Sequence, residues 1–340
     1  MKKEFNLGLA ILRSIMCFFV ILCHCWDDSN ASGIMAFFSF IRVFAVPVFM
    51  FMSFLLVQHT LVKHNRQEII SRFQRLLIPL VGWAVIYWTI YFIIDCIFDT
   101  NLEHGIGDMF WQTISGHSHQ LNPTMWYQVD LIYITLLFLI IILLFKKSYI
   151  NILWFIGFSA ILMQYSGLTM FFDNLSFELK YPIGRFFEML PIASMAFIVS
   201  FKNLLKKLEK QMWTSIISSI ITILVITRYE IFIDISGYGY QGIKPSVIAF
   251  ALVTLFYVIP FNKLPARIKI IIGHMTNYTM GIYCMHRLIA RILDMSIFYL
   301  NIDIKTDSFS WCIFIYLLCY TFSWLGTRIL GNTKLRSLFN

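Results

Sequence analysis

Apolar residues along this chain gather into long runs that are separated by short polar segments. A run of about 20 residues is the length that an α-helix needs to cross the hydrocarbon core of a bilayer. The ninth run is long enough to be kinked or partly interfacial. We therefore expect about ten membrane-spanning helices, near residues 7–26, 34–58, 76–98, 125–145, 149–168, 185–201, 212–230, 246–261, 270–299 and 309–330.

The composition agrees with this pattern. Of the 340 residues, 59% are hydrophobic and 13% are charged, whereas about 25% are charged in an ordinary soluble domain. The sequence thus predicts an all-α, polytopic integral membrane protein. Because the apolar runs recur along the whole chain, we expect residues 1–340 to form a single membrane-embedded domain. The first run lacks a small-residue cleavage site and is expected to be retained.

Positive charge alternates between successive polar joints, and this alternation predicts the orientation. Ten spans place both termini on one side, and the joints of that side hold 18 of the 27 basic residues. By the positive-inside rule, both termini are expected to be cytoplasmic. The net charge of +9 then reflects orientation and contact with membrane lipid, and no nucleic-acid partner is expected.

A small group of ionisable residues falls within the predicted spans or at their edges. A charge in mid-bilayer costs about 2.5–3.5 kcal/mol on the insertion scale, so each such residue needs a partner, water or a function. We expect the functional site among them. They are Arg13, His24, Arg42, Asp130, Arg185, Glu188, Arg228, Glu230, His286, Arg287, Arg291 and Asp294.

Arg13 and His24 occupy one face of the first predicted helix. Eleven residues at 100° each leave them about 20° apart around the axis and about 16 Å apart along it. With a cytoplasmic N-terminus, Arg13 lies toward the cytoplasm and His24 toward the outside. Arg13 could simply extend to lipid headgroups while His24 lies at the interface. However, the position of both residues on one helix face favours a functional pair.

Five stretches, in order, resemble the acyltransferase-3 family of integral-membrane enzymes, which includes bacterial O-antigen and exopolysaccharide O-acetylases. ILRSIMCFFVILCHC resembles the family's first helix, where an arginine and a histidine are separated by ten residues. The resemblance extends from residue 7 to about 290. The other stretches are FAVPVFMFMSFLL at 44–56, RFQRLLIP at 72–79, MWYQVDLIY at 125–133 and YTMGIYCMH at 278–286.

The resemblance implies an O-acyltransferase of the bacterial cytoplasmic (inner) membrane. Its donor would be acetyl-CoA or another acyl-CoA from the cytoplasm, and its acceptor a hydroxyl of a cell-envelope glycan or a lipid-linked sugar. Two departures leave the donor site and the acyl group open. Ala10 stands where the family usually has aspartate, and Ser53-Phe54 where it usually has Ser-Gly.

Three arginines are candidates for holding the donor that the resemblance implies. Arg72 and Arg75 are one helical turn apart, so two guanidinium groups could be presented to one anion. An ordinary cytoplasmic basic joint explains the two charges equally well. Arg13 would steady the phosphates or the long arm of coenzyme A.

His24 is the candidate general base, since neutral imidazole can accept the proton of a sugar hydroxyl as the hydroxyl attacks the thioester. A carboxylate on its other nitrogen would orient it. Asp130 and Glu188 are expected at a similar depth, and either could serve. Both could instead form structural ion pairs with Arg185 or Arg42.

Other interpretations remain open at the level of sequence. His286 could be a second catalytic residue or a structural hydrogen-bonding one. A transporter or flippase of glycan intermediates would also use intramembrane charges, although the chain shows no pair of matching halves of the kind common in transporters. A small-molecule acyltransferase acting on an amino acid is a third possibility. No HExxH or clustered Cys/His spacing indicates a metal site.

Overall fold

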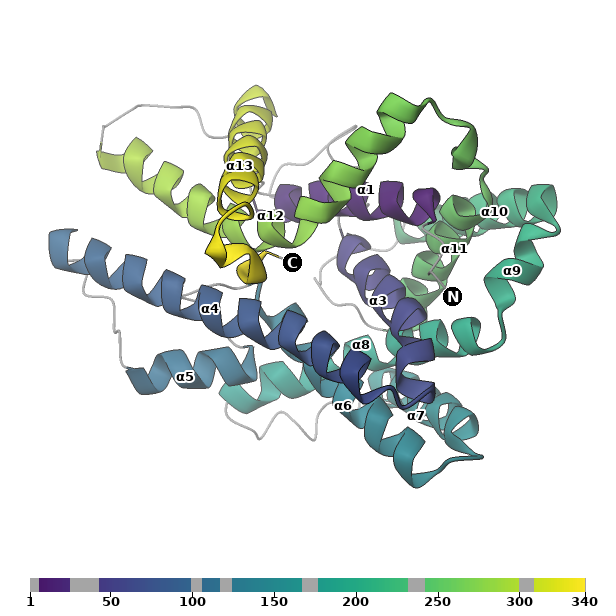
Figure 1. Cartoon of the computed structure of the whole chain (residues 1–340). Coiled ribbons are helices and arrows are strands. Elements are labelled where there is room, and N and C mark those ends of the chain that lie inside the picture. The colour runs from purple at the N-terminus through teal and green to yellow at the C-terminus, as the bar shows by residue number, and fades with distance from the viewer. Residues whose placement is uncertain are drawn as a thin grey trace.

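The computed structural model describes residues 6–24, 43–98, 106–116, 124–166, 177–231, 242–299 and 309–339. Within these segments every regular element is a helix, so the predicted all-α class is confirmed for the described chain (Figure 1). The helices are α1 (Leu7–His24), α3 (Ala45–Val62), α4 (Arg66–Phe98), α5 (Ile106–Ser115), α6 (Trp126–Leu144), α7 (Tyr149–Tyr165), α8 (Phe177–Phe201), α9 (Leu204–Glu209), α10 (Met212–Ile231), α11 (Lys244–Val258), α12 (Ala266–Tyr299) and α13 (Phe309–Leu330), with short 3₁₀ turns η2 (Phe261–Lys263) and η3 (Lys334–Leu338).

Each of the ten predicted spans overlaps one of these helices; α5 and α9 are additional short helices. Helix α4 begins ten residues before its predicted span. The Asn65 side chain explains this early start, because its Oδ1 accepts the Glu68 N–H at 3.3 Å and its Nδ2 donates to the Glu68 carboxylate at 3.1 Å. This reciprocal cap stabilises a polar first turn that hydropathy does not detect. Residues 34–42 of the second predicted span lie outside the described residues.

Five of the described helices contain a segment long and apolar enough to cross a membrane, judged by length and composition. Four shorter apolar helices accompany them. Large apolar side chains cover the outer surface, for example Trp154, Phe155 and Leu224. Such an apolar exterior is typical of a protein that contacts lipid. The full count of ten crossings and the side of the termini stay predictions.

Helix α1 packs against α3, α11, α12 and α13 and thus lies among elements from both ends of the chain. Its contact with α11 is very close, since a Cβ on Gly8 would lie 1.7 Å from the carbonyl oxygen of Phe256. The buried core includes Leu12 of α1, Phe51 of α3 and Tyr316 of α13. Residues of the first helix are therefore held against residues that come nearly 250 or more positions later.

Helix α12 is long and bent. A straight helix of 34 residues would extend about 51 Å, well beyond the roughly 30 Å hydrocarbon core. Figure 1 shows α12 as two arms that meet at an angle near the middle of the helix. A kink was one of the two possibilities that the length of the ninth apolar run predicted.

Two glycines of α12 provide a matched test of how closely α12 packs against α13. A Cβ at Gly281 would lie 2.2 Å from Cγ2 of Thr327, whose side chain is fully buried, whereas a Cβ at Gly273 would meet nothing within 4 Å. We expect Gly281→Ala to lower the melting temperature, because overpacking costs about 1–3 kcal/mol. Gly273→Ala should leave it unchanged or raise it, because alanine favours the helix by up to about 1 kcal/mol. Melting curves of both variants in one detergent are the measurement, and equal effects would contradict the α12–α13 contact.

Candidate active site

The site is built on the contact between α1 and α12. The hydroxyls of Ser14 and Thr276 lie 3.2 Å apart, and the Cys17 thiol donates to the carbonyl oxygen of Thr279 at 3.7 Å. These polar contacts join the two helices next to Arg13 and one turn after it, and they fix the register of the two helices. With that register, His24 at the end of α1 comes level with the middle of α12.

The structure brings His24 and His286 together, although 262 positions separate them in the sequence. Their ring centroids lie 5.2 Å apart with the planes tilted by 36°. His286 is fully buried; its Nδ1 lies 3.3 Å from the carbonyl oxygen of Ile282, and its Nε2 has no hydrogen-bond partner among the described residues. The next residue, Arg287, donates to the backbone carbonyl of His24 at 3.4 Å. The two predicted histidines therefore belong to one site.

Two tyrosines extend this histidine pair into the protein. The Tyr283 ring lies 6.0 Å from the His286 ring and 5.9 Å from the Tyr127 ring, and its hydroxyl donates to the carbonyl oxygen of Thr124. Tyr127 in turn lies within electrostatic range of the guanidinium groups of Arg13 and Arg72. A row of rings thus runs from the histidine pair to Tyr127, where the charges of two of the predicted arginines act.

Arg13 has an exposed side chain in the middle of α1, while Leu12 and Met16 beside it are buried. It lies within electrostatic range of Cys17 as well as Tyr127. Surrounding protein desolvates the Arg13 guanidinium, yet part of the side chain keeps solvent-accessible surface through which an anionic ligand can approach. Ala10, the first of the two departures noted in the sequence, is buried against α12, with its carbonyl oxygen 3.1 Å from the Thr276 hydroxyl.

Arg72 and Arg75 point in different directions. The Nη2 of Arg72 donates to the Ser53 hydroxyl at 3.0 Å and lies 3.4 Å from the Thr135 hydroxyl, and the guanidinium lies 5.9 Å from the centroid of the Phe54 ring. Arg75 is exposed and donates to the carbonyl oxygen of Ser71 at 3.2 Å. Arg72 therefore joins α3, α4 and α6 inside the bundle, and its Nε is buried with no hydrogen-bond partner among the described residues.

Phe54, the second departure from the family pattern, is a core residue. It is fully buried, and its ring packs edge-on against Phe138 with centroids 5.0 Å apart. The extra bulk fills space between α3 and α6 next to Arg72. Arg72 is thus supported by an aromatic face at this position.

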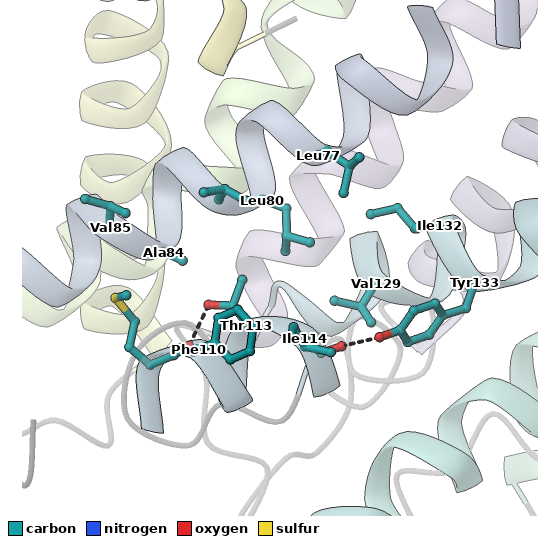
Figure 2. A pocket seen from close by; sticks show the side chains of 12 residues that line it. Leu77, Leu80, Ala84, Val85, Phe110, Thr113, Ile114, Val129, Ile132 and Tyr133 are labelled. Carbon is teal, nitrogen blue, oxygen red and sulfur yellow. Dashed lines mark hydrogen bonds between the residues drawn. The ribbon is translucent and has the colours of Figure 1, made fainter. Parts of the chain in front are cut away.

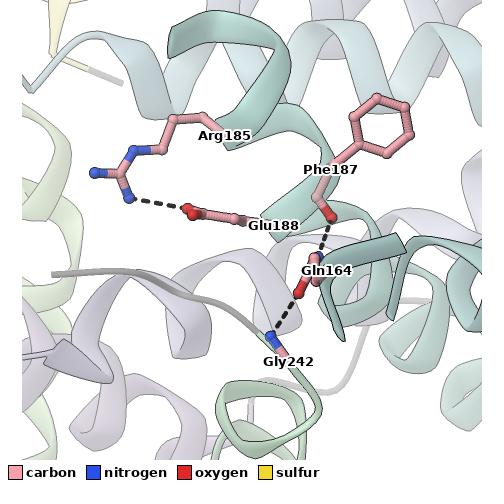
Figure 3. A network of polar contacts seen from close by, with 5 residues as sticks. All are labelled: Gln164, Arg185, Phe187, Glu188 and Gly242. Atoms are coloured by element: carbon pink, nitrogen blue, oxygen red, sulfur yellow. Dashed lines mark hydrogen bonds and ion pairs between the residues drawn. The ribbon is translucent and has the colours of Figure 1, made fainter. Parts of the chain in front are cut away.

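The two candidate carboxylates have different surroundings. Glu188 forms an ion pair with Arg185 at 3.1 Å (Figure 3). Arg185 also lies 5.0 Å from the centroid of the Trp126 ring. The ion pair with Arg185, one of the alternatives from the sequence, is therefore present for Glu188. Asp130 is buried, lies within electrostatic range of both members of this pair, and its Oδ2 has no hydrogen-bond partner among the described residues. Arg42, the other proposed partner, lies outside them.

A second polar contact shown in Figure 3 connects the elements around this pair. The Gln164 side chain donates to the carbonyl oxygen of Phe187 at 2.8 Å and accepts the N–H of Gly242. It links α7, α8 and the segment before α11. Gly242 has a positive φ of 80°, which glycine adopts without strain.

An apolar groove of about 700 Å³, including its open mouth, lies between α4, α5 and α6 (Figure 2). It contains none of the predicted site residues. Tyr133 closes one end by donating to the carbonyl oxygen of Ile114 at 2.8 Å. The remaining lining residues are Leu77, Leu80, Val81, Ala84, Val85, Met109, Phe110, Thr113, Val129 and Ile132.

An apolar helical exterior around an interior group of arginine, histidine and tyrosine side chains defines a membrane protein with an embedded polar site. The sequence model of the acyltransferase-3 family, described as an acyltransferase domain, matches residues 6–328. The chain belongs to this family and is a membrane acyltransferase, as the five motifs predicted. No curated protein and no solved structure matches the chain.

Sequence reasoning did not single out Tyr283 or Thr135 as contributors to the site. Tyr283 precedes His286 by three residues, so the helical period places both on similar faces, and this was a usable signal. Thr135 lies two turns beyond Tyr127 on α6, and its contact with Arg72 depends on how α4 packs against α6. That contact has no signature in the sequence.

The contrast between Arg72 and Arg75 generates a prediction about stability. We expect Arg72→Ala to reduce the free energy of unfolding by about 1–3 kcal/mol, because buried hydrogen bonds to a charged group are lost. Arg75→Ala should change it by no more than about 0.5 kcal/mol, as is usual for an exposed side chain. Unfolding midpoints in the same detergent measure both, and a larger loss for Arg75→Ala would show that the side chains are placed the other way round.

Proposed function

We propose that this membrane acyltransferase moves an acyl group, acetyl in the first instance, from acyl-coenzyme A to a hydroxyl of a cell-envelope glycan or lipid-linked sugar. The observation that carries the proposal is the row of rings that runs from the His24–His286 pair to Tyr127, together with the charge of Arg13 that acts on Tyr127. A cationic group at one end suits an anionic donor, and a histidine at the other suits proton transfer.

The donor end would consist of Arg13 and Arg72, with Arg75 at the surface. Guanidinium groups bind phosphate through paired N–H donors. Both Arg13 and Arg72 lie within electrostatic range of the Tyr127 side chain, so both charges act on the same region. An exposed Arg75 could meet the 3′-phosphate or pyrophosphate first as coenzyme A enters from the cytoplasm.

His24 would act as the general base. Its ring nitrogen accepts the hydroxyl proton of the sugar while the hydroxyl oxygen attacks the thioester carbonyl carbon. The tetrahedral intermediate then collapses, the carbon–sulfur bond breaks, and the coenzyme A thiolate leaves and receives the proton from His24. The products are the ester and free coenzyme A, so all atoms and charges balance.

His286 and a carboxylate would support that base. The His286 ring, fixed by burial beside His24, limits the orientations that the His24 ring can adopt. Asp130 is the better carboxylate candidate of the two, because Glu188 is already paired with Arg185. Asp130 follows Tyr127 by one helical turn on α6, so it lies beside the row of rings.

The orientation forms part of the proposal. Ten crossings with cytoplasmic termini place Arg13 and Arg72 toward the compartment that makes acyl-coenzyme A, and place His24 toward the outer half, where envelope glycans are presented. Support comes from the charge alternation of the joints and from the helix that overlaps each predicted span. The membrane would be the bacterial cytoplasmic (inner) membrane.

The function is tested by following the acyl group. Purified protein in lipid is expected to release free coenzyme A from labelled acetyl-coenzyme A, and mass spectrometry of envelope glycans should show an acetyl increment that depends on an intact gene.

His24→Ala should lower kcat by about 10²–10⁴-fold, the usual contribution of a general base, while coenzyme A affinity stays nearly constant. Arg13→Lys should instead weaken coenzyme A binding by roughly tenfold or more, since hydrogen bonds to a charged group are worth about 1.5–3 kcal/mol.

The matched control for His24→Ala is His59→Ala, which removes an exposed imidazole from α3 and should leave both quantities unchanged. Calorimetry with coenzyme A and a melting curve accompany each variant. Movement of an unmodified glycan without thioester turnover would support a transporter and reject the enzyme mechanism. Full activity of His24→Ala would remove His24 as the base.

Orientation is tested by thiol labelling of exposed positions in intact cells. Single cysteines at His64, Lys147 and Lys206 should react only after the membrane is made permeable, and cysteines at Asp108 and Ser166 should react with an impermeant reagent at once. All five side chains are exposed in the structure. Reaction of any one from the wrong side would mean that the number of crossings before it is wrong.

A further inference from the structure

The hydroxyl of Tyr87 bridges two backbone groups of another helix. Tyr87 belongs to α4 and is fully buried. Its hydroxyl donates to the carbonyl oxygen of Cys284 and accepts the N–H of Leu288, both at 2.9 Å. In a regular α-helix the N–H of residue 288 donates to the carbonyl of residue 284. A side chain of α4 is therefore inserted between partners that normally bond to each other.

An inserted side chain is one of the known origins of a helix bend. Sharp helix kinks arise at proline, at glycine, at π-bulges, or where a side chain or water enters the i to i−4 ladder. Helix α12 contains no proline, and the bridged turn, residues 284–288, lies near the middle of its 34 residues. Figure 1 shows the two arms of α12 meeting near the middle of the helix. The glycine nearest to that turn, Gly281, precedes it by three residues and packs against Thr327.

The bridged turn also carries the histidine of the site. His286 lies midway between Cys284 and Leu288, and the adjacent Arg287 donates to the backbone of His24. The direction in which both side chains leave α12 depends on the geometry of this one turn. Closing the turn into a regular helix would rotate His286 relative to α1 and change its 5.2 Å approach to His24.

We infer that Tyr87 is a positioning residue: its hydroxyl holds one turn of α12 open and thereby sets His286 and Arg287 against His24. The effect on catalysis rests on the proposed function, in which the two histidines form the reacting pair. The effect on the shape of α12 does not depend on the proposed function. Shape and rate can therefore be measured separately.

The experiment compares Tyr87→Phe with wild type. Phenylalanine keeps the ring and removes only the hydroxyl, so the Cys284 carbonyl and the Leu288 N–H become free to bond to each other. The bend is measured as the distance between two spin labels, attached to keto amino acids at Ile270 and Ser296. Both positions are exposed, and they lie on opposite arms of α12. These positions are about 39 Å apart in a straight helix. We expect a shorter distance in wild type and a shift toward that value in Tyr87→Phe.

Kinetics of the same variant report the consequence for the site. We expect kcat for acetyl transfer to fall by about 10–100-fold, because a displacement of about 1 Å can cost that much, while the KM for acetyl-coenzyme A stays within about twofold. The matched control is Tyr91→Phe, one turn along α4, whose buried ring packs edge-on against Tyr87 at 6.0 Å. Tyr91→Phe should change neither the distance nor the rate.

The outcomes separate the two parts of the inference. An unchanged distance in Tyr87→Phe overturns the structural role and leaves Gly281 as the origin of the bend. A shifted distance with an unchanged kcat overturns the positioning role of Tyr87 in catalysis. Loss of the folded protein, judged by the melting curve, also contradicts the inference, because the two freed backbone groups should satisfy each other. A shift together with a lower kcat and a constant KM supports it.

Discussion

The contact between α1 and α12 is the interaction on which the candidate site depends. A hydrogen bond between the hydroxyls of Ser14 and Thr276 and one from the Cys17 thiol to α12 hold the two helices in one register. The absence of a Cβ at Gly8 lets α1 approach α11 closely. Polar side chains are costly at membrane depth unless they have partners. Each hydroxyl or thiol on this contact therefore both stabilises the bundle and fixes the depth of Arg13 and His24.

Helix α12 shows how a membrane helix can depart from regular geometry without leaving backbone groups unpaired. The Tyr87 hydroxyl replaces a direct backbone hydrogen bond with two bonds of its own. In hydrocarbon an unsatisfied N–H or C=O costs several kcal/mol, so an opened turn needs such a substitute. The opened turn coincides with the position of His286, where a precise side-chain direction matters for its approach to His24.

The arginines illustrate how packing divides residues that look equivalent in sequence. Arg72 and Arg75 follow the same short motif, yet only Arg72 reaches Ser53 and Thr135 inside the bundle. Phe54 contributes the aromatic face beneath it. A chain with glycine at that position would leave a gap there, so the departure from the family pattern changes the shape of the region around Arg72.

The sequence by itself determined the helical class, the approximate position of each long helix and the family. Runs of about 20 apolar residues, helical spacing of Arg13 and His24, and local motifs are properties of contiguous residues, so they are visible without a structure. The partners of each side chain were decided by tertiary structure. The 5.2 Å approach of His24 to His286, the contact of Arg72 with Thr135 and the insertion of Tyr87 into α12 each join residues from different helices. Helix packing brings these groups together in three dimensions, and hydropathy carries no record of which faces will meet.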